Sequence, residues 1–140
     1  MKIKNRVTFL NGPWGSGKTH MALQMVEGKQ YEIIRPYHFI ENRINGHIKK
    51  DTEVVVLEDV YFASASILKL LTSEKIIVRH IEKTSLGKTI VAYAGDAFEM
   101  PTPKFILISG NEKLAEHEFN GIEDFKMITC SLPKSLRKKL

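Results

Sequence analysis

The sequence predicts an α/β fold, a three-layer domain built around a central, mostly parallel sheet of about five strands with an inserted β-hairpin. Three observations lead to this prediction. Short apolar runs alternate with helical patterns along the chain, a glycine-rich loop joins the first such run to the first helix, and two β-rich runs flank a short turn. The length of 140 residues is that of one domain. We therefore predict a single domain over residues 1–132, followed by a basic tail over residues 133–140.

The first half of the chain gives three strands and two helical segments. Residues 6–12 (RVTFLNG) predict a short strand that enters the glycine loop, and residues 17–29 predict a helix that Gly28 can end. Residues 31–36 predict a second short strand, and residues 37–50 a loop and helix with a break near Gly46. The unbroken apolar run over residues 52–60 (TEVVVLEDV) is typical of a central parallel strand that is buried on both faces.

The second half adds a helix, a hairpin and two further strands. Residues 62–75 have a helical pattern, and the two β-rich runs within residues 75–95 flank Thr84–Gly87 as a hairpin would. Residues 104–111 (KFILISGN) predict an apolar strand that ends in Gly110 and Asn111, and residues 125–132 a last strand.

The glycine loop has the spacing G-x-x-x-x-G-K-[ST], which wraps phosphates with backbone N–H groups at the start of a helix. In this pattern Lys18 reaches the β- and γ-phosphates and the Thr19 hydroxyl holds Mg²⁺. Trp14 allows three interpretations: it shields the nucleotide, contacts a neighbouring subunit, or packs against the sheet edge. The predicted nucleotide-binding residues are Gly12, Pro13, Trp14, Gly15, Ser16, Gly17, Lys18, Thr19 and His20.

Polar side chains stand at the ends of two other predicted strands. Glu58 and Asp59 end the apolar run, at the edge where ligands of open α/β sheets bind. One acid is expected to hold Mg²⁺ and the other to orient or deprotonate the attacking water, without a clear assignment between them. An amide at Asn111 can hydrogen-bond the γ-phosphate or that water. Lys18, Glu58, Asp59 and Asn111 are thus the predicted catalytic residues, and Thr19, Glu58 and Asp59 the predicted metal ligands.

The order of these pieces resembles the superfamily 3 helicases, the AAA-type ATPase domains of replication proteins from small DNA viruses and some plasmids. The resemblance rests on GPWGSGKT, VVVLEDV, IIVRHIEKTSLGKTIV and PKFILISGN. It implies a P-loop ATPase with ATP and Mg²⁺ as cofactors, and Asn111 as a sensor of the γ-phosphate. It also implies a ring, usually hexameric, whose hairpins grip single-stranded DNA.

The predicted hairpin carries several cations, which suit a phosphate backbone. The predicted DNA-binding residues are Arg79, Lys83 and Lys88. Relatives commonly carry a basic pair at the tip itself, where this chain has Thr84 and Ser85. A solvated surface hairpin is the alternative interpretation.

Two features depart from the family pattern. Relatives have an arginine just before the last strand that completes the neighbouring subunit's site, whereas here Asp124 stands near that position and Lys126 is the closest cation. A lysine is a poorer substitute for the planar donor fork of arginine. Relatives also carry a helical collar before the ATPase core, which we expect to be absent here or to lie on another polypeptide.

Three functions remain open. The first is an ATP-dependent DNA helicase or translocase in phage, viral or plasmid replication. The second is an ATP-binding switch or assembly factor with weak hydrolysis, which the replaced arginine favours. The third is a nucleotide kinase, which the lack of an arginine-rich lid disfavours.

Composition bounds the partners and the compartment. The formal net charge of +5 favours anionic partners, here a nucleotide and single-stranded DNA, besides a homo-oligomeric ring or another replication protein. Cys130 is the single cysteine, so no internal disulfide can form. No apolar run is long enough to span a membrane, and the N-terminal stretch is too short for a secretory signal. We therefore expect an intracellular protein, in the bacterial or phage-infected cytoplasm or in the nucleus of a eukaryotic host.

Overall fold

The computed structural model describes residues 3–35, 48–60, 65–83, 91–110 and 116–131. Five strands form one sheet in the order β2-β3-β6-β1-β7, and every neighbouring pair is parallel. The fold is therefore α/β around a parallel five-stranded sheet, as predicted. The strands are β1 (Val7–Asn11), β2 (Tyr31–Ile34), β3 (Val54–Val60), β6 (Lys104–Ser109) and β7 (Phe125–Thr129).

The three inner strands are buried on both faces because their apolar side chains alternate between two cores. On β3, Val55 and Leu57 belong to one hydrophobic cluster, and Val54 and Val56 belong to the other. The edge strand β7 has a half-exposed pattern instead. The prediction that residues 52–60 form a strand buried on both faces is confirmed.

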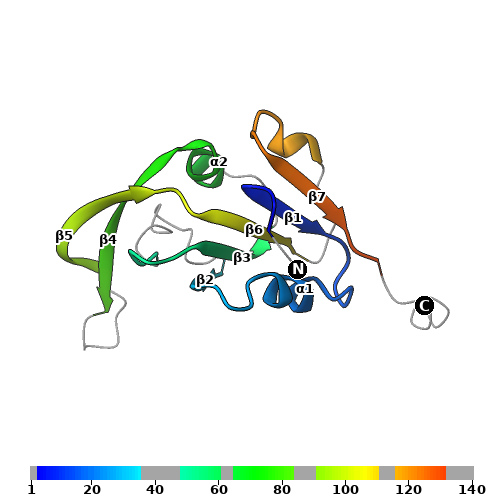
Figure 1. Cartoon of the computed structure of the whole chain (residues 1–140), viewed down its shortest axis with the longest axis horizontal. Helices are drawn as coiled ribbons and strands as arrows, with labels where there is room; N and C mark the ends of the chain where they lie inside the picture. The colour runs from blue at the N-terminus through cyan, green and yellow to red at the C-terminus, as the bar shows by residue number, and fades with distance from the viewer. Residues whose placement is uncertain (1–2, 36–47, 61–64, 84–90, 111–115, 132–140) are drawn as a thin grey trace.

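Helices cover both faces of the sheet, as Figure 1 shows. Helix α1 (Lys18–Met25) lies on one face and buries Lys18, Ala22 and Met25, which share one side of the helix. Helix α2 (Ala65–Thr72) lies on the opposite face, together with the short 3₁₀ helix η3 (Glu116–Phe119). The arrangement gives the three layers expected from the sequence.

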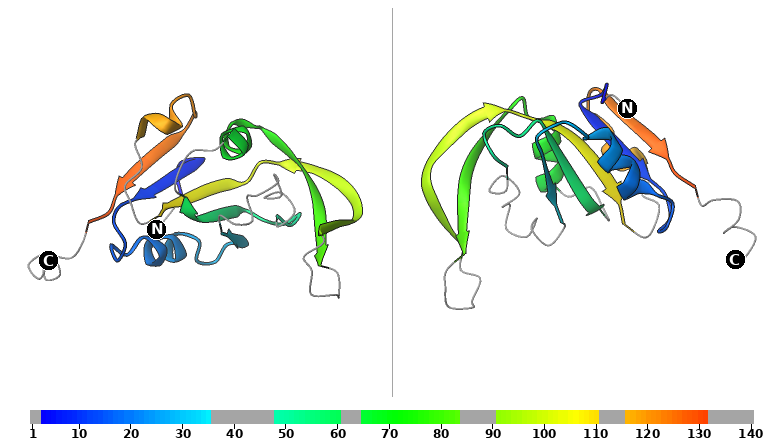
Figure 2. Two further views of the ribbon diagram at one scale, coloured as in Figure 1. Left: turned by 180° about the vertical axis from the view of Figure 1, so that it is seen from behind. Right: turned by 60° about the horizontal axis from the view of Figure 1, so that its bottom comes forward.

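An antiparallel ribbon projects beyond the sheet, as both views in Figure 2 show. It consists of β4 (Lys75–Lys83) and β5 (Val91–Pro101), which form a separate two-stranded sheet. The predicted antiparallel pairing of the two runs is confirmed, and the turn predicted at Thr84–Gly87 lies outside the described residues. Strand β5 runs past Gly95, where we expected the strand to end. Its far end pairs with the start of β4, from Lys75 opposite Pro101 to Val78 opposite Phe98. The alternation of Phe98 and Met100 with polar residues supports this longer strand.

The amino edge of the sheet is closed by a turn before β7. The Asp124 carboxylate accepts hydrogen bonds from the Asn5 amide at 2.8 Å and from the Arg6 backbone N–H at 3.0 Å. Its backbone carbonyl accepts a third from the Val7 N–H at 3.2 Å. These bonds fix the start of β1, and therefore the direction in which the strand delivers the glycine loop at its other end.

Candidate phosphate-binding site

The glycine loop leaves the carboxyl end of β1 in a backbone conformation that its glycines permit. Gly15 and Gly17 have φ values of +83° and +82°, in the left-handed region that L side chains rarely adopt. A Cβ atom at Gly12 would lie 2.4 Å from the Cys130 carbonyl oxygen, so the backbone just after β7 approaches too closely for any side chain there. The Ser16 hydroxyl and N–H both donate to the Pro13 carbonyl, at 2.7 and 3.3 Å, which closes the turn at the tip.

Lys18 opens α1 and is 7% exposed. Its ammonium group donates to the carbonyl oxygen of Gly12, to the Ser109 hydroxyl at 3.1 Å and to the Gly110 carbonyl at 3.0 Å. Burial lowers the pKa of Lys18, whereas the ionised form of Cys130 and the Asp59 carboxylate act to raise it. A buried cation at the start of a helix is an electrostatic arrangement that attracts an anion.

A cavity of about 340 Å³ opens at this edge of the sheet. Lys18 and Asp59 line the same hollow, which is the juxtaposition that the sequence predicted for the glycine loop and the acidic strand end. In open α/β folds, ligands bind at the carboxyl ends of the parallel strands, which is the edge where this cavity lies. The lining residues are Trp14, Gly15, Gly17, Lys18, Thr19, His20, Asp59, Ile108, Ser109 and Gly110.

The two neighbouring acids have different surroundings. Between the pairs Leu57–Leu107 and Val60–Ser109, β3 advances by one residue more than β6, and Asp59 has a φ of +52°. This is a β-bulge, a feature that re-aims side chains beside sites. It returns Val60 to the core face of Leu57 and leaves Asp59 exposed at the cavity.

Glu58 is not among the cavity residues. Its carboxylate forms an ion pair with Arg35 at 3.3 Å, just after the edge strand β2. Glu58 lies before the turn of the backbone at Asp59, so it keeps the ordinary alternation and faces away from the Leu57 side of the sheet. The structure therefore separates two acids that the sequence left equivalent.

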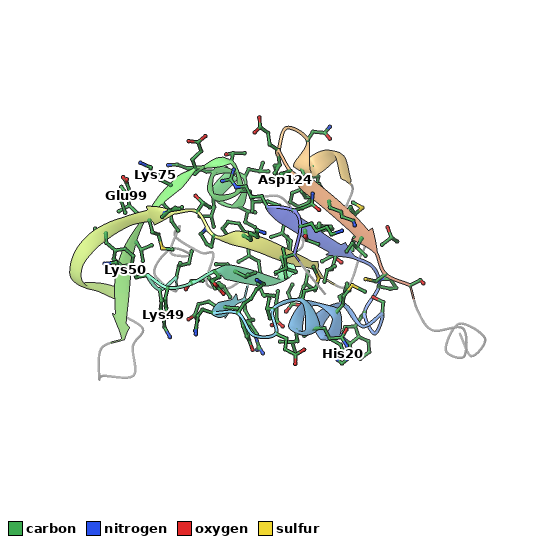
Figure 3. All side chains as sticks on the ribbon, viewed as in Figure 1. His20, Lys49, Lys50, Lys75, Glu99 and Asp124 are labelled. Carbon is green, nitrogen blue, oxygen red and sulfur yellow. The ribbon has the colours of Figure 1, made fainter. Side chains whose placement is uncertain are left out.

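Three of the predicted binding residues support the loop and are not among the residues that line the cavity. Gly12 packs against Cys130, and Pro13 and Ser16 form the turn at the loop tip. Trp14 is 81% exposed, which rules out the interpretation that it packs against the sheet edge. His20, a residue of α1 that lines the cavity with Trp14, approaches Gln24 with its Nε2 at 3.3 Å, and Figure 3 shows it well apart from Asp124.

Magnesium is the metal that the sequence predicts here. In the described residues, no group of three or more His, Cys, Asp or Glu side chains could hold a metal ion. Mg²⁺ bound with a nucleotide takes most of its ligands from phosphate and water, with one or two carboxylates. On the cavity wall, Asp59 supplies one carboxylate, and the hydroxyl of Thr19 offers a further oxygen ligand.

Sequence reasoning missed Ser109. Its hydroxyl is 2% exposed and contacts both Gly12 and Lys18. The available signal was a hydroxyl residue two positions before Asn111, at the end of an apolar strand. Its meaning depends on β6 lying between β1 and β3, which the sequence does not reveal.

Some of the predicted residues lie outside the part of the chain that the structure describes. Asn111 and Lys88 fall outside the described residues, as do the tail over 133–140 and most of the helical segment over 37–50. Arg79 and Lys83 belong to β4 of the projecting ribbon.

No protein-family model matches the chain, and no curated protein matches it. None of the helices in the described part of the chain has the length and hydropathy needed to cross a membrane.

Proposed function

We propose that this protein binds ATP with Mg²⁺ in the cavity at the carboxyl edge of the sheet and hydrolyses it. One observation carries the proposal: Lys18, Thr19 and Asp59 line a single hollow at the start of α1. A cation, a hydroxyl and a carboxylate in this arrangement match the needs of a triphosphate and its metal.

In the proposed complex, each residue has one task. The backbone of the loop and Lys18 hold the β- and γ-phosphates, and Thr19 binds Mg²⁺. Asp59 would hold the metal, directly or through water, because it lines the cavity and the Glu58 carboxylate is paired with Arg35. Asn111 follows β6, between β1 and β3, and would orient the γ-phosphate or the attacking water.

We further propose that hydrolysis drives a helicase or translocase of the superfamily 3, AAA-type kind on single-stranded DNA. The resemblance of the motifs supports this proposal, and so does the β4–β5 ribbon, which projects from the sheet and carries Arg79 and Lys83 in its strand β4. In such a motor the ribbons of a ring contact the DNA while nucleotide is bound between neighbouring subunits.

ATP turnover with and without single-stranded DNA tests both parts. Lys18→Ala is expected to abolish turnover in either condition. The double change Lys83→Ala and Lys88→Ala is expected to remove only the stimulation by DNA, whereas Lys4→Ala with Lys29→Ala, exposed lysines outside the ribbon, keeps it. An enzyme whose turnover and particle mass ignore single-stranded DNA contradicts the helicase, and an absence of ATP binding contradicts the ATPase.

A second candidate, an ATP-binding switch with weak hydrolysis, is favoured by Asp124. The region that in superfamily 3 helicases supplies a catalytic arginine here carries an aspartate bound to Asn5 and Arg6, and the following cation is Lys126 on β7. A trans-acting arginine contributes about 10³–10⁵-fold in rate. Tight ATP binding without measurable turnover, with or without DNA, would favour the switch.

A further inference from the structure

The Ser109 hydroxyl joins three parts of the candidate site. It accepts a hydrogen bond from the Gly12 N–H at 3.2 Å and one from the Lys18 ammonium at 3.1 Å. It donates its own proton to the Gly12 carbonyl at 3.2 Å. A hydroxyl has one proton and two lone pairs, so this buried group is fully used.

The Lys18 ammonium is also fully used. An ammonium group has three N–H donors, and here they face the Gly12 carbonyl, the Ser109 hydroxyl and the Gly110 carbonyl. A phosphate oxygen can therefore accept a hydrogen bond from Lys18 only by replacing one of these three acceptors. Two of them are backbone carbonyls of residues that flank the cavity, and the third is the buried side chain of β6.

We propose that Ser109 is a positioning residue of the nucleotide site, which keeps the Lys18 ammonium and Gly12 against the end of β6 while a phosphate oxygen replaces one of the two carbonyl acceptors. The inference rests on the proposed ATP site. Strand β6 would thus contribute to phosphate binding through Ser109, although Ser109 does not itself touch the reacting atoms.

Two measurements on the full chain test the proposal. The first is the dissociation constant of ATP with Mg²⁺ at neutral pH. The second, without nucleotide, is the melting temperature. For Ser109→Ala we expect about ten-fold weaker ATP binding and a lower melting temperature. Ser109→Thr, which keeps the hydroxyl, is expected to restore both.

Thr102→Ala is the matched control. Its hydroxyl donates to the Ser73 carbonyl at 2.6 Å before the other end of β6, so the change also removes one internal hydrogen bond. It should lower the melting temperature without altering ATP affinity. If Ser109→Ala behaves like Thr102→Ala while the wild type binds ATP, the positioning role is wrong and the proposed function survives. If the wild type binds no ATP, both are wrong. If Ser109→Thr does not fold, the contrast between the two alanine variants decides.

Discussion

Asp59 and Asp124 have the same backbone conformation at opposite edges of the sheet, with φ values of +52° and +54°. In the described residues they are the two non-glycine positions with positive φ, a conformation that costs free energy for an L residue. At the amino edge, Asp124 turns all its oxygen atoms towards the chain and accepts bonds from Asn5, Arg6 and Val7. At the carboxyl edge, the bulge leaves Asp59 exposed on the wall of a cavity.

The contrast separates a structural use of strain from a functional one. The hydrogen bonds that Asp124 accepts from Asn5, Arg6 and Val7, at the start of β1, offset the free-energy cost of its positive φ. Asp59 has a similarly unfavourable positive φ, but its carboxylate remains exposed and can contact a ligand in the cavity. Strained positions whose side chains face a cavity are candidates for function.

The largest effect is expected on ATP turnover when the charge of Asp59 is removed. Asp59→Asn keeps the side-chain shape and tolerates positive φ, but it removes the charge that would hold Mg²⁺. We expect ATP turnover to fall by at least about 100-fold, with the melting temperature nearly unchanged. Asp124→Asn serves as the control, since it removes the same charge from the amino edge. Equal turnover in the two variants would contradict the assignment of Asp59.

The next effect is on stability and uses one substitution at both sites. Glycine relieves the unfavourable φ in either place. Asp124→Gly also removes two hydrogen bonds of a carboxylate, so we expect its free energy of unfolding to fall by about 2 kcal/mol. Asp59→Gly is expected to change it by less than about 1 kcal/mol. Urea unfolding of both variants measures the difference, and the reverse order would show that the bonds of Asp124 are not the main stabilising term.

The affinity for ATP is expected to depend on pH through Lys18. Because burial lowers the pKa of Lys18, the ammonium that should bind phosphate is lost below the ordinary lysine range. The affinity for ATP should therefore decline at alkaline pH before exposed lysines lose their charge. Calorimetric titration across this range measures the decline. An affinity that stays constant until the ordinary lysine pKa would contradict it.

The smallest expected effect concerns the acid beside Asp59. Glu58→Gln removes the ion pair with Arg35, whose side chain is 61% exposed, and such pairs contribute at most about 1 kcal/mol. Turnover should stay within a few-fold of the wild type, because Glu58 is not a cavity residue. A loss as large as that of Asp59→Asn would return Glu58 to the catalytic group.

The sequence predicted the elements and the loop because local signals define them. The spacing of Gly12, Gly17 and Lys18 and the apolar runs of the inner strands are readable without any tertiary knowledge. The same holds for the ribbon, whose two β-rich runs flank a short turn.

The sequence could not assign Glu58 and Asp59, because a bulge at one residue reverses the alternation of the strand and Asp gives no clear signal for positive φ. It could not single out Ser109 either. That residue gains its contacts from long-range topology, which brings the end of β6 between the glycine loop and the acidic strand end.

The most direct test of the central claim is a crystal structure of the protein with a non-hydrolysable ATP analogue and Mn²⁺ in place of Mg²⁺, located by anomalous scattering. We expect the β- and γ-phosphates within the loop that begins at Gly12 and the Mn²⁺ signal between Thr19 and Asp59. A nucleotide bound elsewhere, or a metal ion on the side of Glu58 and Arg35, would contradict it.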